Sequence, residues 1–385
     1  MFVRTNRWVY LLLAGLLAWS LNAAQAAEFS LDAKSWLLVD VTSGQILHAN
    51  NADERVEPAS LTKLMTAYLA FNALRDGKLT LDQRPPVSQH AYKAIGSRMF
   101  VDPLKPATVE ELLQGMIVQS GNDASIILAE AIAGSEEAFA GMMNDVAARM
   151  RLTNTNFTNA TGLPNKDHYS SARDMATLAI RLILDHNDHY ALYSQKEYTY
   201  NDIRQFNRNR LLFIDNTVDG MKTGYTDAAG YCLVASALRE QPAANFSRRL
   251  LTVVLGTKSP KARIAQTQKL LNYGFQNFDA LRIYKQGQST GSYRVWKGDS
   301  DQIEGTVARD VIVTIPKGAN ELVSAEIERV EPLVAPIEQG QAIGTLRVKL
   351  DNQLLLQQQL VASTAVPEGG WLSKLWDGLQ MRVAR

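Results

Sequence analysis

A serine and a lysine three residues apart stand at the start of a mostly apolar segment. Ser60 and Lys63 follow a turn that ends in Pro58, and the apolar spacing from Ser60 onward predicts an amphipathic helix. Side chains at i and i+3 share one helix face, with Cβ atoms ~5–6 Å apart. A serine becomes a nucleophile when a base takes its proton, and burial or a second cation lowers the pKa of a lysine enough for that task. The structural alternative is a serine cap with a surface lysine, and S-x-x-K alone is a weak motif.

Two further triplets strengthen the catalytic interpretation. Ser120-Gly121-Asn122 separates two helical stretches, where a hydroxyl and an amide can project into a cleft or simply form an interhelical turn. Lys222-Thr223-Gly224 is expected at the start of a strand, as an active-site cation and hydroxyl or as an edge-strand lysine entering a turn. Because the three motifs in this order are far rarer by chance than any one alone, they favour one shared catalytic cleft.

Other catalytic signatures are absent from the sequence. It contains no H-E-x-x-H, C-x-x-C or P-loop pattern. Of the five histidines, only His186 and His189 have a helical metal-ligand spacing, and their polar surroundings favour a solvated helix end. We therefore predict no metal and no cofactor.

The elements that position these residues divide the chain into an α+β part and an all-β part. Helices that bracket a sheet built from both ends of the segment predict an α+β domain over 27–282. Alternating apolar and polar residues then predict a small β-sandwich over 283–365. The expected elements of the first domain are strands within 34–54, helices from Ser60, within 107–134, from Ser171 and over 260–278, and two apolar strands with a loop at 239–247.

Composition limits the class of protein. The chain has 385 residues, 46% hydrophobic and 21% charged, and its net charge of +1 with no basic run excludes a typical nucleic-acid-binding protein. Cys232 is the only cysteine, so no intramolecular disulfide can form. Its apolar, strand-like surroundings predict a small buried side chain rather than a nucleophile.

The two ends carry targeting patterns. Residues 1–26 combine Arg4 and Arg7, an apolar run shorter than the ~20 residues that span a bilayer, and a small-x-small site, which predicts a cleaved secretory signal. Residues 366–385 predict an amphipathic helix lying in a membrane interface, or a terminal helix packed on its own domain. One arc of this helix holds Trp371, Leu372, Leu375, Trp376, Leu379 and Val383.

The three motifs resemble those of the penicillin-recognising serine enzymes. More of the chain resembles the D-alanyl-D-alanine carboxypeptidases of the penicillin-binding protein five and six type, including the β-rich second domain and the terminal helix. The segments that carry this resemblance are EPASLTKLMT, QSGNDAS, YSSARDMA, IRQFNRN and VDGMKTGYTDAAGYCLVASA. It implies a penicillin-recognising, β-lactamase-like fold, a periplasmic protein anchored to the outer face of the inner membrane, peptidoglycan pentapeptides as substrate and β-lactams as covalent inhibitors.

The resemblance also implies residue roles. Ser60 corresponds to the acylated nucleophile, Lys63 to its general base and Ser120 to a proton-transfer group. Backbone N–H groups of Ser60 and Tyr225 correspond to the oxyanion hole. The substrate-binding positions implied are Asn122, Lys222, Thr223, Gly224, Tyr225, Arg263 and, less closely matched, Arg204. These types suit a D-Ala-D-Ala terminus, whose carboxylate requires cations and whose amide carbonyl requires oxyanion donors.

Two departures from the family pattern leave alternatives open. Tyr225 follows K-T-G where many relatives have histidine, and Thr161 begins a T-G-L segment where relatives often have H-G-L. A class A β-lactamase is disfavoured because 151–171 contains no glutamate to activate a deacylating water, so slow β-lactam release is expected. Endopeptidase or transpeptidase activity shares the same acyl-enzyme, whereas a non-catalytic scaffold would have no need of these residues.

Overall fold

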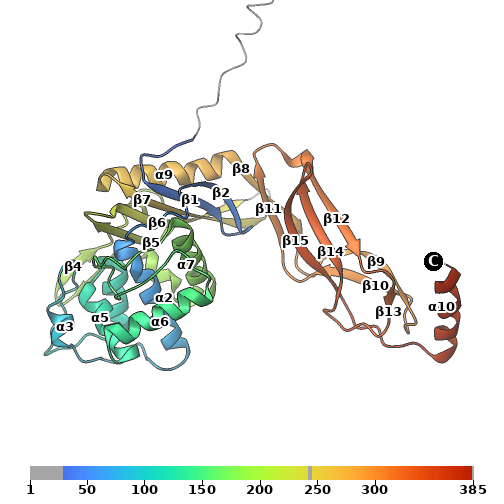
Figure 1. Cartoon of the computed structure of the whole chain (residues 1–385), viewed down its shortest axis with the longest axis horizontal. Helices are drawn as coiled ribbons and strands as arrows, with labels where there is room; N and C mark the ends of the chain where they lie inside the picture. Colours follow the sequence, from blue (N-terminus) through green and yellow to red (C-terminus); the bar gives the residue numbers. More distant parts are fainter. Residues whose placement is uncertain (1–28, 242–244, 384–385) are drawn as a thin grey trace, which may run out of the picture. The chain divides into compact units, whose positions relative to one another are not determined.

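The computed structural model describes residues 29–241 and 245–383, and the expected signal segment lies outside these ranges. Within them, a mixed helix-and-sheet part precedes an all-β part along the chain (Figure 1). This is the order of fold classes that the sequence predicts.

A five-stranded antiparallel sheet forms the centre of the first part. Its order is β2-β1-β7-β6-β5, so strands from both ends of this part meet in one sheet. A separate hairpin pairs β3 with β4. The strands are β1 (Ser35–Asp40), β2 (Gln45–Asn50), β3 (Glu197–Tyr200), β4 (Ile203–Phe206), β5 (Val218–Thr226), β6 (Gly230–Gln241) and β7 (Phe246–Thr257).

The prediction of two strands at the end of this sheet was wrong, because three are present. β5 and β6 form a hairpin around residues 227–229, where Asp-Ala-Ala lacks a strong turn signature before Gly230. Lys222 consequently lies inside β5 rather than at the start of a strand. Of the alternative, an edge-strand lysine entering a turn, only the edge strand is found: β5 is the last strand of the sheet, but Lys222 lies within it and is 2% exposed.

Helices surround the sheet and provide most of the core. Polar N-caps begin several of these helices: Thr108 forms a capping box with Glu111, and the hydroxyls of Ser171 and Ser259 accept from the third residue of their helices. The helical elements are η1 (Ala59–Thr62), α2 (Lys63–Arg75), α3 (Gln89–Tyr92), α4 (Val109–Gln114), η2 (Gly115–Gln119), α5 (Asn122–Ala133), α6 (Glu136–Arg149), α7 (Ala172–Asp185), α8 (Asn187–Tyr190), η3 (Ala191–Ser194), η4 (Arg210–Phe213) and α9 (Pro260–Asn277).

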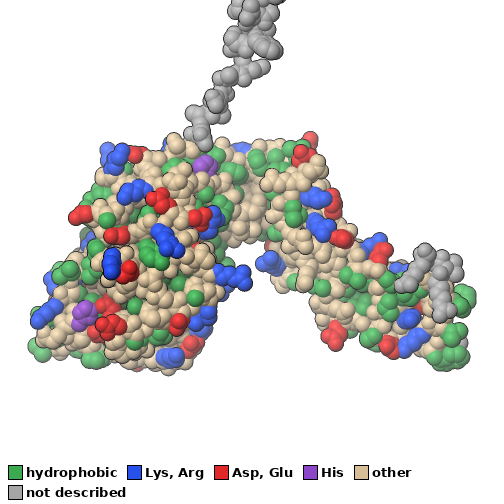
Figure 2. All heavy atoms as spheres, in the orientation of Figure 1, with side chains coloured by type: hydrophobic (Ala, Val, Ile, Leu, Met, Phe, Trp, Pro, Cys, Tyr) green, Lys and Arg blue, Asp and Glu red, His purple; other side chains and the backbone are tan. Residues whose placement is uncertain are grey.

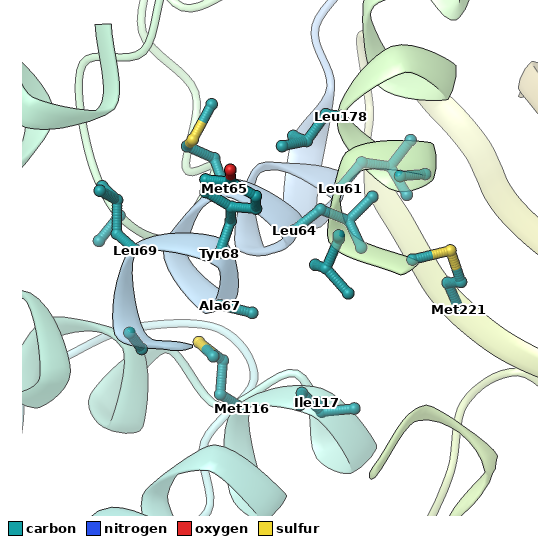
Figure 3. Packing of buried hydrophobic residues seen from close by; sticks show 14 of the residues in the cluster. Leu61, Leu64, Met65, Ala67, Tyr68, Leu69, Met116, Ile117, Leu178 and Met221 are labelled. Carbon is teal, nitrogen blue, oxygen red and sulfur yellow. The ribbon is translucent and has the colours of Figure 1, made fainter. Parts of the chain in front are cut away.

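Helix α2 is the centre of this core. Ten of its 13 residues are buried, so it is surrounded by protein rather than amphipathic as the sequence predicts. Figure 3 shows its side chains meeting Met116 and Ile117 of η2, Leu178 of α7 and Met221 of β5. The polar residues Lys63 and Thr66 near the start of α2 are buried with the apolar ones, because the motif there lies inside the fold.

The second part is all-β, as predicted. A six-stranded sheet in the order β12-β14-β15-β10-β9-β13 and a two-stranded sheet of β11 and β8 share a buried apolar cluster, which gives a small sandwich. Its elements are β8 (Phe278–Tyr284), β9 (Ser289–Trp296), β10 (Gln302–Val307), β11 (Val311–Pro316), η5 (Asn320–Leu322), β12 (Val323–Arg329), β13 (Leu333–Val334), β14 (Ala342–Leu350) and β15 (Gln353–Ala362).

A terminal helix, α10 (Trp371–Val383), follows this sandwich. Trp371, Leu375, Trp376 and Leu379 are all more than half exposed.

On the face of the molecule in Figure 2, basic and acidic side chains are interspersed, in keeping with the small net charge. Among the described residues, no helix has both the length and the apolar character needed to cross a bilayer.

A buried ion pair joins two neighbouring strands of the five-stranded sheet, β1 and β7. Arg248 Nε of β7 donates to Asp40 Oδ2 of β1 at 2.7 Å, and both side chains are at most 1% exposed. The other carboxylate oxygen accepts from the backbone N–H groups of Thr42 and Ser43. A buried carboxylate needs such compensation, because removing one partner leaves an isolated charge in the core.

We expect Arg248→Met to lower the free energy of unfolding by about 3–5 kcal/mol, since Asp40 loses its cation while staying buried. Urea or thermal unfolding of the soluble chain measures this loss. The double variant D40N/R248M keeps an acceptor for the turn without a charge and should recover much of the stability. Equal stability of the wild type and R248M would contradict the prediction.

Candidate active site

The turn that carries Ser60 is held between two close neighbours. Ser60 lies in η1, one turn before α2, and Ala59 beside it adopts a left-handed φ of 48°. A Cβ on Gly224 of β5 would lie 3.0 Å from the Pro58 carbonyl oxygen, and one on Gly162 only 1.8 Å from that of Ala59. Only glycine permits these backbones to approach so closely, so β5 and the 159–163 loop both touch the Ser60 turn.

Lys63 is the most constrained polar residue of the site. Its Nζ donates to Ser60 Oγ at 3.0 Å, Asn122 Oδ1 at 2.7 Å and the Thr161 carbonyl at 2.6 Å, and the residue is 1% exposed. Burial, followed by the positive charge of Arg208, lowers the pKa of Lys63 to about 7. A large share of the side chain is therefore a neutral amine near neutral pH, hydrogen-bonded to the serine.

A second buried lysine lies across the cleft. Lys222 Nζ donates to Ser120 Oγ at 2.8 Å and to the Thr223 carbonyl at 2.9 Å. Burial, with the charges of Lys63 and two arginines, lowers the pKa of Lys222 well below its usual value. Ser120 adopts a left-handed φ of 68° where η2 ends, so the break between helices directs its hydroxyl to this lysine. The hydrogen bond from Lys222 to Ser120 thus joins strand β5 to the break between η2 and α5.

The expected amide, Asn122, bridges the site to its wall. While Oδ1 accepts from Lys63, its Nδ2 donates to the Ile95 carbonyl at 2.6 Å. Both ends of the amide are therefore used within the protein, which fixes its orientation.

Two arginines add positive charge to the cleft. Arg263 is 8% exposed, donates from Nη1 to the Gly224 carbonyl at 3.5 Å, and has a buried Nε without a hydrogen-bond partner in the described part of the chain. Arg208 is a lining residue of the cleft, and its burial lowers its pKa. Neither guanidinium has a carboxylate within 4 Å among the residues described, so both remain available to an anionic ligand.

Tyr225 lies at the mouth of the cleft and is 49% exposed. Its hydroxyl donates to Asp227 Oδ1 at 2.7 Å, and its ring stacks on Tyr231 with centroids 4.2 Å apart. The hydrogen bond and charge of Asp227 raise the pKa of Tyr225 to about 12, so the side chain stays neutral. It therefore offers an aromatic wall at the mouth of the cleft.

Arg204 is the predicted site residue that the fold engages least. It belongs to β4 and lines the cleft, but it is exposed and bound to the Glu197 carboxylate at 2.6 Å. Its charge is already matched within the β3–β4 hairpin. The structure thus brings Ser60, Ser120, Asn122, Thr223, Gly224, Tyr225 and Arg263 to one cleft, with Lys63 and Lys222 buried beneath it, and leaves Arg204 on the rim.

The cleft has a volume of about 890 Å³, enough for a short peptide. Exposed apolar side chains, Phe100, Ile203 and Phe206, form part of its wall. The buried thiol of Cys232 is not among the lining residues, and burial raises its pKa to about 11, which confirms the expectation of an unreactive cysteine. Across the residues that the structure describes, no cluster of three or more His, Cys, Asp or Glu could hold a metal.

Two contributors were missed by the sequence analysis. Arg208 lies within the IRQFNRN segment, but only Arg204 was selected there, and the first arginine is the paired one. The second is the Thr161 carbonyl, which accepts from Lys63 Nζ. It was missed because every residue type carries the same main-chain oxygen, so the sequence does not mark it. The departure from histidine at this position therefore leaves the lysine contact intact, because the backbone makes it.

Comparisons with known proteins agree with this geometry. Residues 21–259 match Peptidase_S11, D-alanyl-D-alanine carboxypeptidase, and residues 278–368 match the penicillin-binding protein 5 C-terminal domain. The chain is 41% identical to D-alanyl-D-alanine carboxypeptidase DacC of Escherichia coli, over 92% of this chain and 89% of that protein.

Solved structures show the same likeness. Penicillin-binding protein 5 from Haemophilus influenzae superposes with a TM-score of 0.82 at 39% identity, covering 88% of this chain and 99% of that one. Penicillin-binding protein D2 from Listeria monocytogenes, in its ampicillin-bound form, gives 0.58 at 29% identity over 64% of this chain and 99% of its own. The chain belongs to the Peptidase S11 family of D-alanyl-D-alanine carboxypeptidases, which are serine hydrolases.

Proposed function

We propose that this chain removes the terminal D-alanine of peptidoglycan pentapeptide stems through an acyl-enzyme on Ser60. The observation that carries this proposal is Lys63 Nζ, buried and 3.0 Å from Ser60 Oγ, with a pKa of about 7. A base whose pKa lies near the working pH combines a useful neutral fraction with sufficient basicity. Loss of one terminal D-alanine per stem removes the donor group for cross-linking and so limits cross-linking of the wall.

The first chemical step uses Ser60 and Lys63. The neutral amine takes the hydroxyl proton while Oγ attacks the carbonyl carbon of the penultimate D-alanine. The carbonyl oxygen gains the negative charge and is stabilised by the N–H groups of Ser60 and Tyr225 as an oxyanion hole. The close approach of Gly224 to Pro58 supports this pairing, because it brings the two backbones together.

The substrate carboxylate pairs with the cations of the cleft. Arg208, Arg263 and Lys222 supply positive charge, and Thr223 supplies a hydroxyl at the cleft surface. Binding an anion there relieves the repulsion among these buried cations and places the scissile amide over Ser60.

Completion of the reaction uses the second serine and lysine. Collapse of the tetrahedral intermediate breaks the C–N bond, and the leaving amine takes a proton that Lys63 received, relayed through Ser120 beside Lys222. Water then attacks the Ser60 ester and gives a proton to Lys63. As the bond between the acyl carbon and Ser60 Oγ breaks, Lys63 returns this proton to Oγ, which releases the shortened stem and restores the free serine and the neutral amine. If a second peptide amine replaced this water, the outcome would be transpeptidation.

β-Lactams are expected to acylate the same serine. The ampicillin-bound Listeria relative supports this expectation, and no glutamate in 151–171 is available to hasten release. The protein should therefore behave as an inhibited enzyme with penicillin rather than as a β-lactamase.

The chain ends support a location at the outer face of the inner membrane. The pattern in residues 1–26 favours export to the periplasm, and the exposed tryptophans and leucines of α10 suit a helix lying in the bilayer interface. The proposed organisation is a signal at 1–26, a catalytic domain at 27–282, a β-domain at 283–365 and an anchor at 366–385.

Ser60→Ala should abolish release of D-alanine from a pentapeptide, with a loss on the order of 10⁴-fold or more, and should abolish labelling by fluorescent penicillin. Ser194→Ala serves as the matched control with full labelling, because Ser194 is exposed and its hydroxyl donates to the Ala191 carbonyl three residues earlier. Labelling that persists in S60A would remove the nucleophile assignment.

The rate constant of penicillin acylation should rise with pH and reach half its maximum near pH 7, because Lys63 acts as the base only when it is neutral. This rise is the acid limb of the pH profile. Arg208→Gln should shift this limb to higher pH, since it removes a cation that lowers the pKa of Lys63. Stopped-flow penicillin acylation measures the limb. The comparison variant Arg204→Gln should not move it, because Glu197 already pairs that charge; equal shifts in both variants would contradict the assignment.

Deletion of residues 367–385 should move the protein from the membrane fraction to the soluble fraction, because it removes the exposed apolar arc of α10. Fractionation after expression with the native N-terminus measures the distribution. The double variant W371S/W376S should give a partial release at full length. Unchanged membrane association of the deletion would exclude α10 as the anchor.

A further inference from the structure

One buried histidine next to the catalytic lysine has no role in the chemistry described above. His168 is 3% exposed and lies at the end of the loop between α6 and α7. Its Nε2 is 2.7 Å from Thr62 Oγ1, in the turn between Ser60 and Lys63. Its Nδ1 lies 3.1 Å from the backbone N–H of Thr158. The imidazole therefore connects this loop to the catalytic turn.

The partners define the protonation state of the ring. A backbone N–H can only donate, so Nδ1 of His168 accepts from Thr158 and the ring proton lies on Nε2. Nε2 then donates to the Thr62 hydroxyl. Burial and the charge of Lys63 lower the pKa of His168 to about 4, which agrees with a neutral ring at the pH of catalysis.

Few charged groups face this region. Lys63 approaches from α2, and Glu136 approaches from α6, where its Oε1 accepts from the Ala160 N–H and its Oε2 bonds His90. No carboxylate lies within hydrogen-bond distance of the His168 ring in the described ranges. A second cation at His168 would face Lys63 without compensation, so the site requires the neutral form.

The loop is attached to the catalytic helix at three neighbouring points. His168 bonds to Thr62, Thr66 Oγ1 donates to the Ala160 carbonyl at 2.7 Å, and Lys63 donates to the Thr161 carbonyl. At the next residue, Gly162, the loop backbone packs directly on Ala59. These contacts lie next to Lys63, which is 1% exposed, so the loop contributes to its burial.

We propose that His168 is a positioning residue for acylation, holding the 157–163 loop on Thr62 so that the Thr161 carbonyl stays on Lys63 and the lysine stays dry. This rests on the proposed role of Lys63 as the base. Releasing the loop would admit water to Lys63, and since desolvation is the main cause of its lowered pKa, that pKa would rise.

Two conservative variants separate the contact of the ring with Thr62 from its contacts with Thr158. Gln places an N–H donor near the position of Nε2, so His168→Gln keeps the bond to Thr62. Asn places an acceptor near Nδ1, so His168→Asn keeps the bond to Thr158 and loses the attachment to the helix. His168→Ala loses both. The measurement is the rate constant of penicillin acylation of the full chain from pH 5 to 9.

We expect the acid limb of H168A and H168N to move up by about one pH unit, which lowers acylation at pH 6 about tenfold. The limb of H168Q should stay near the wild-type position. His186→Ala is the matched control, because His186 is also buried but packs between Tyr68 and Phe71, away from the loop. It should lower the melting temperature without moving the limb.

Equal limbs in H168Q and H168N, or a wild-type limb in folded H168A, would overturn the inference. The Gln and Asn pair decides the question even if H168A does not fold. The role of Lys63 as the base is tested separately. If Lys63→Ala is still acylated at the wild-type rate, Lys63 is not the base, whatever the histidine variants show.

Discussion

Burial of the Lys63 ammonium is the constraint on which the rest of the site depends. A cation with 1% exposure in a core is costly unless it is hydrogen-bonded or neutral. The fold meets this demand with three acceptors, Ser60 Oγ, Asn122 Oδ1 and the Thr161 carbonyl, drawn from three separate segments. The same burial that destabilises the charge lowers the pKa of Lys63 to about 7, so a share of the amine is neutral near neutral pH and can take the proton of the serine.

Positive charge in the cleft is concentrated beyond what the fold neutralises. Lys63, Lys222, Arg208 and Arg263 all have lowered pKa values, with burial as the first cause in each. Buried cations of one sign repel one another, which favours binding of an anion and loss of a proton from one of them. The carboxylate of the substrate is the anion that these cations bind. Lys63 is the cation that loses its proton, which lets it act as the base.

Backbone shape matters as much as side-chain identity. Ser120 and Ala59 have left-handed φ values, and Gly162 and Gly224 allow main chains to meet around the Ser60 turn. Such conformations are uncommon and persist because the surrounding packing determines them. Helix α2, with ten of its 13 residues buried, supplies part of that packing next to the Ser60 turn.

The sequence by itself determined the three motifs and the change from α+β to all-β, because these depend on residue types at short spacings, and its resemblance to a known family indicated the reaction class. The hairpin of β5 and β6 was missed, since its turn has no strong local signature. Only the tertiary structure decided that Arg208 rather than Arg204 acts on Lys63, that a Thr161 carbonyl holds it, and that His168 ties the loop to Thr62. Electrostatic and desolvation effects act through space, and main-chain oxygens are alike in every residue, so neither leaves a pattern in the order of amino acids.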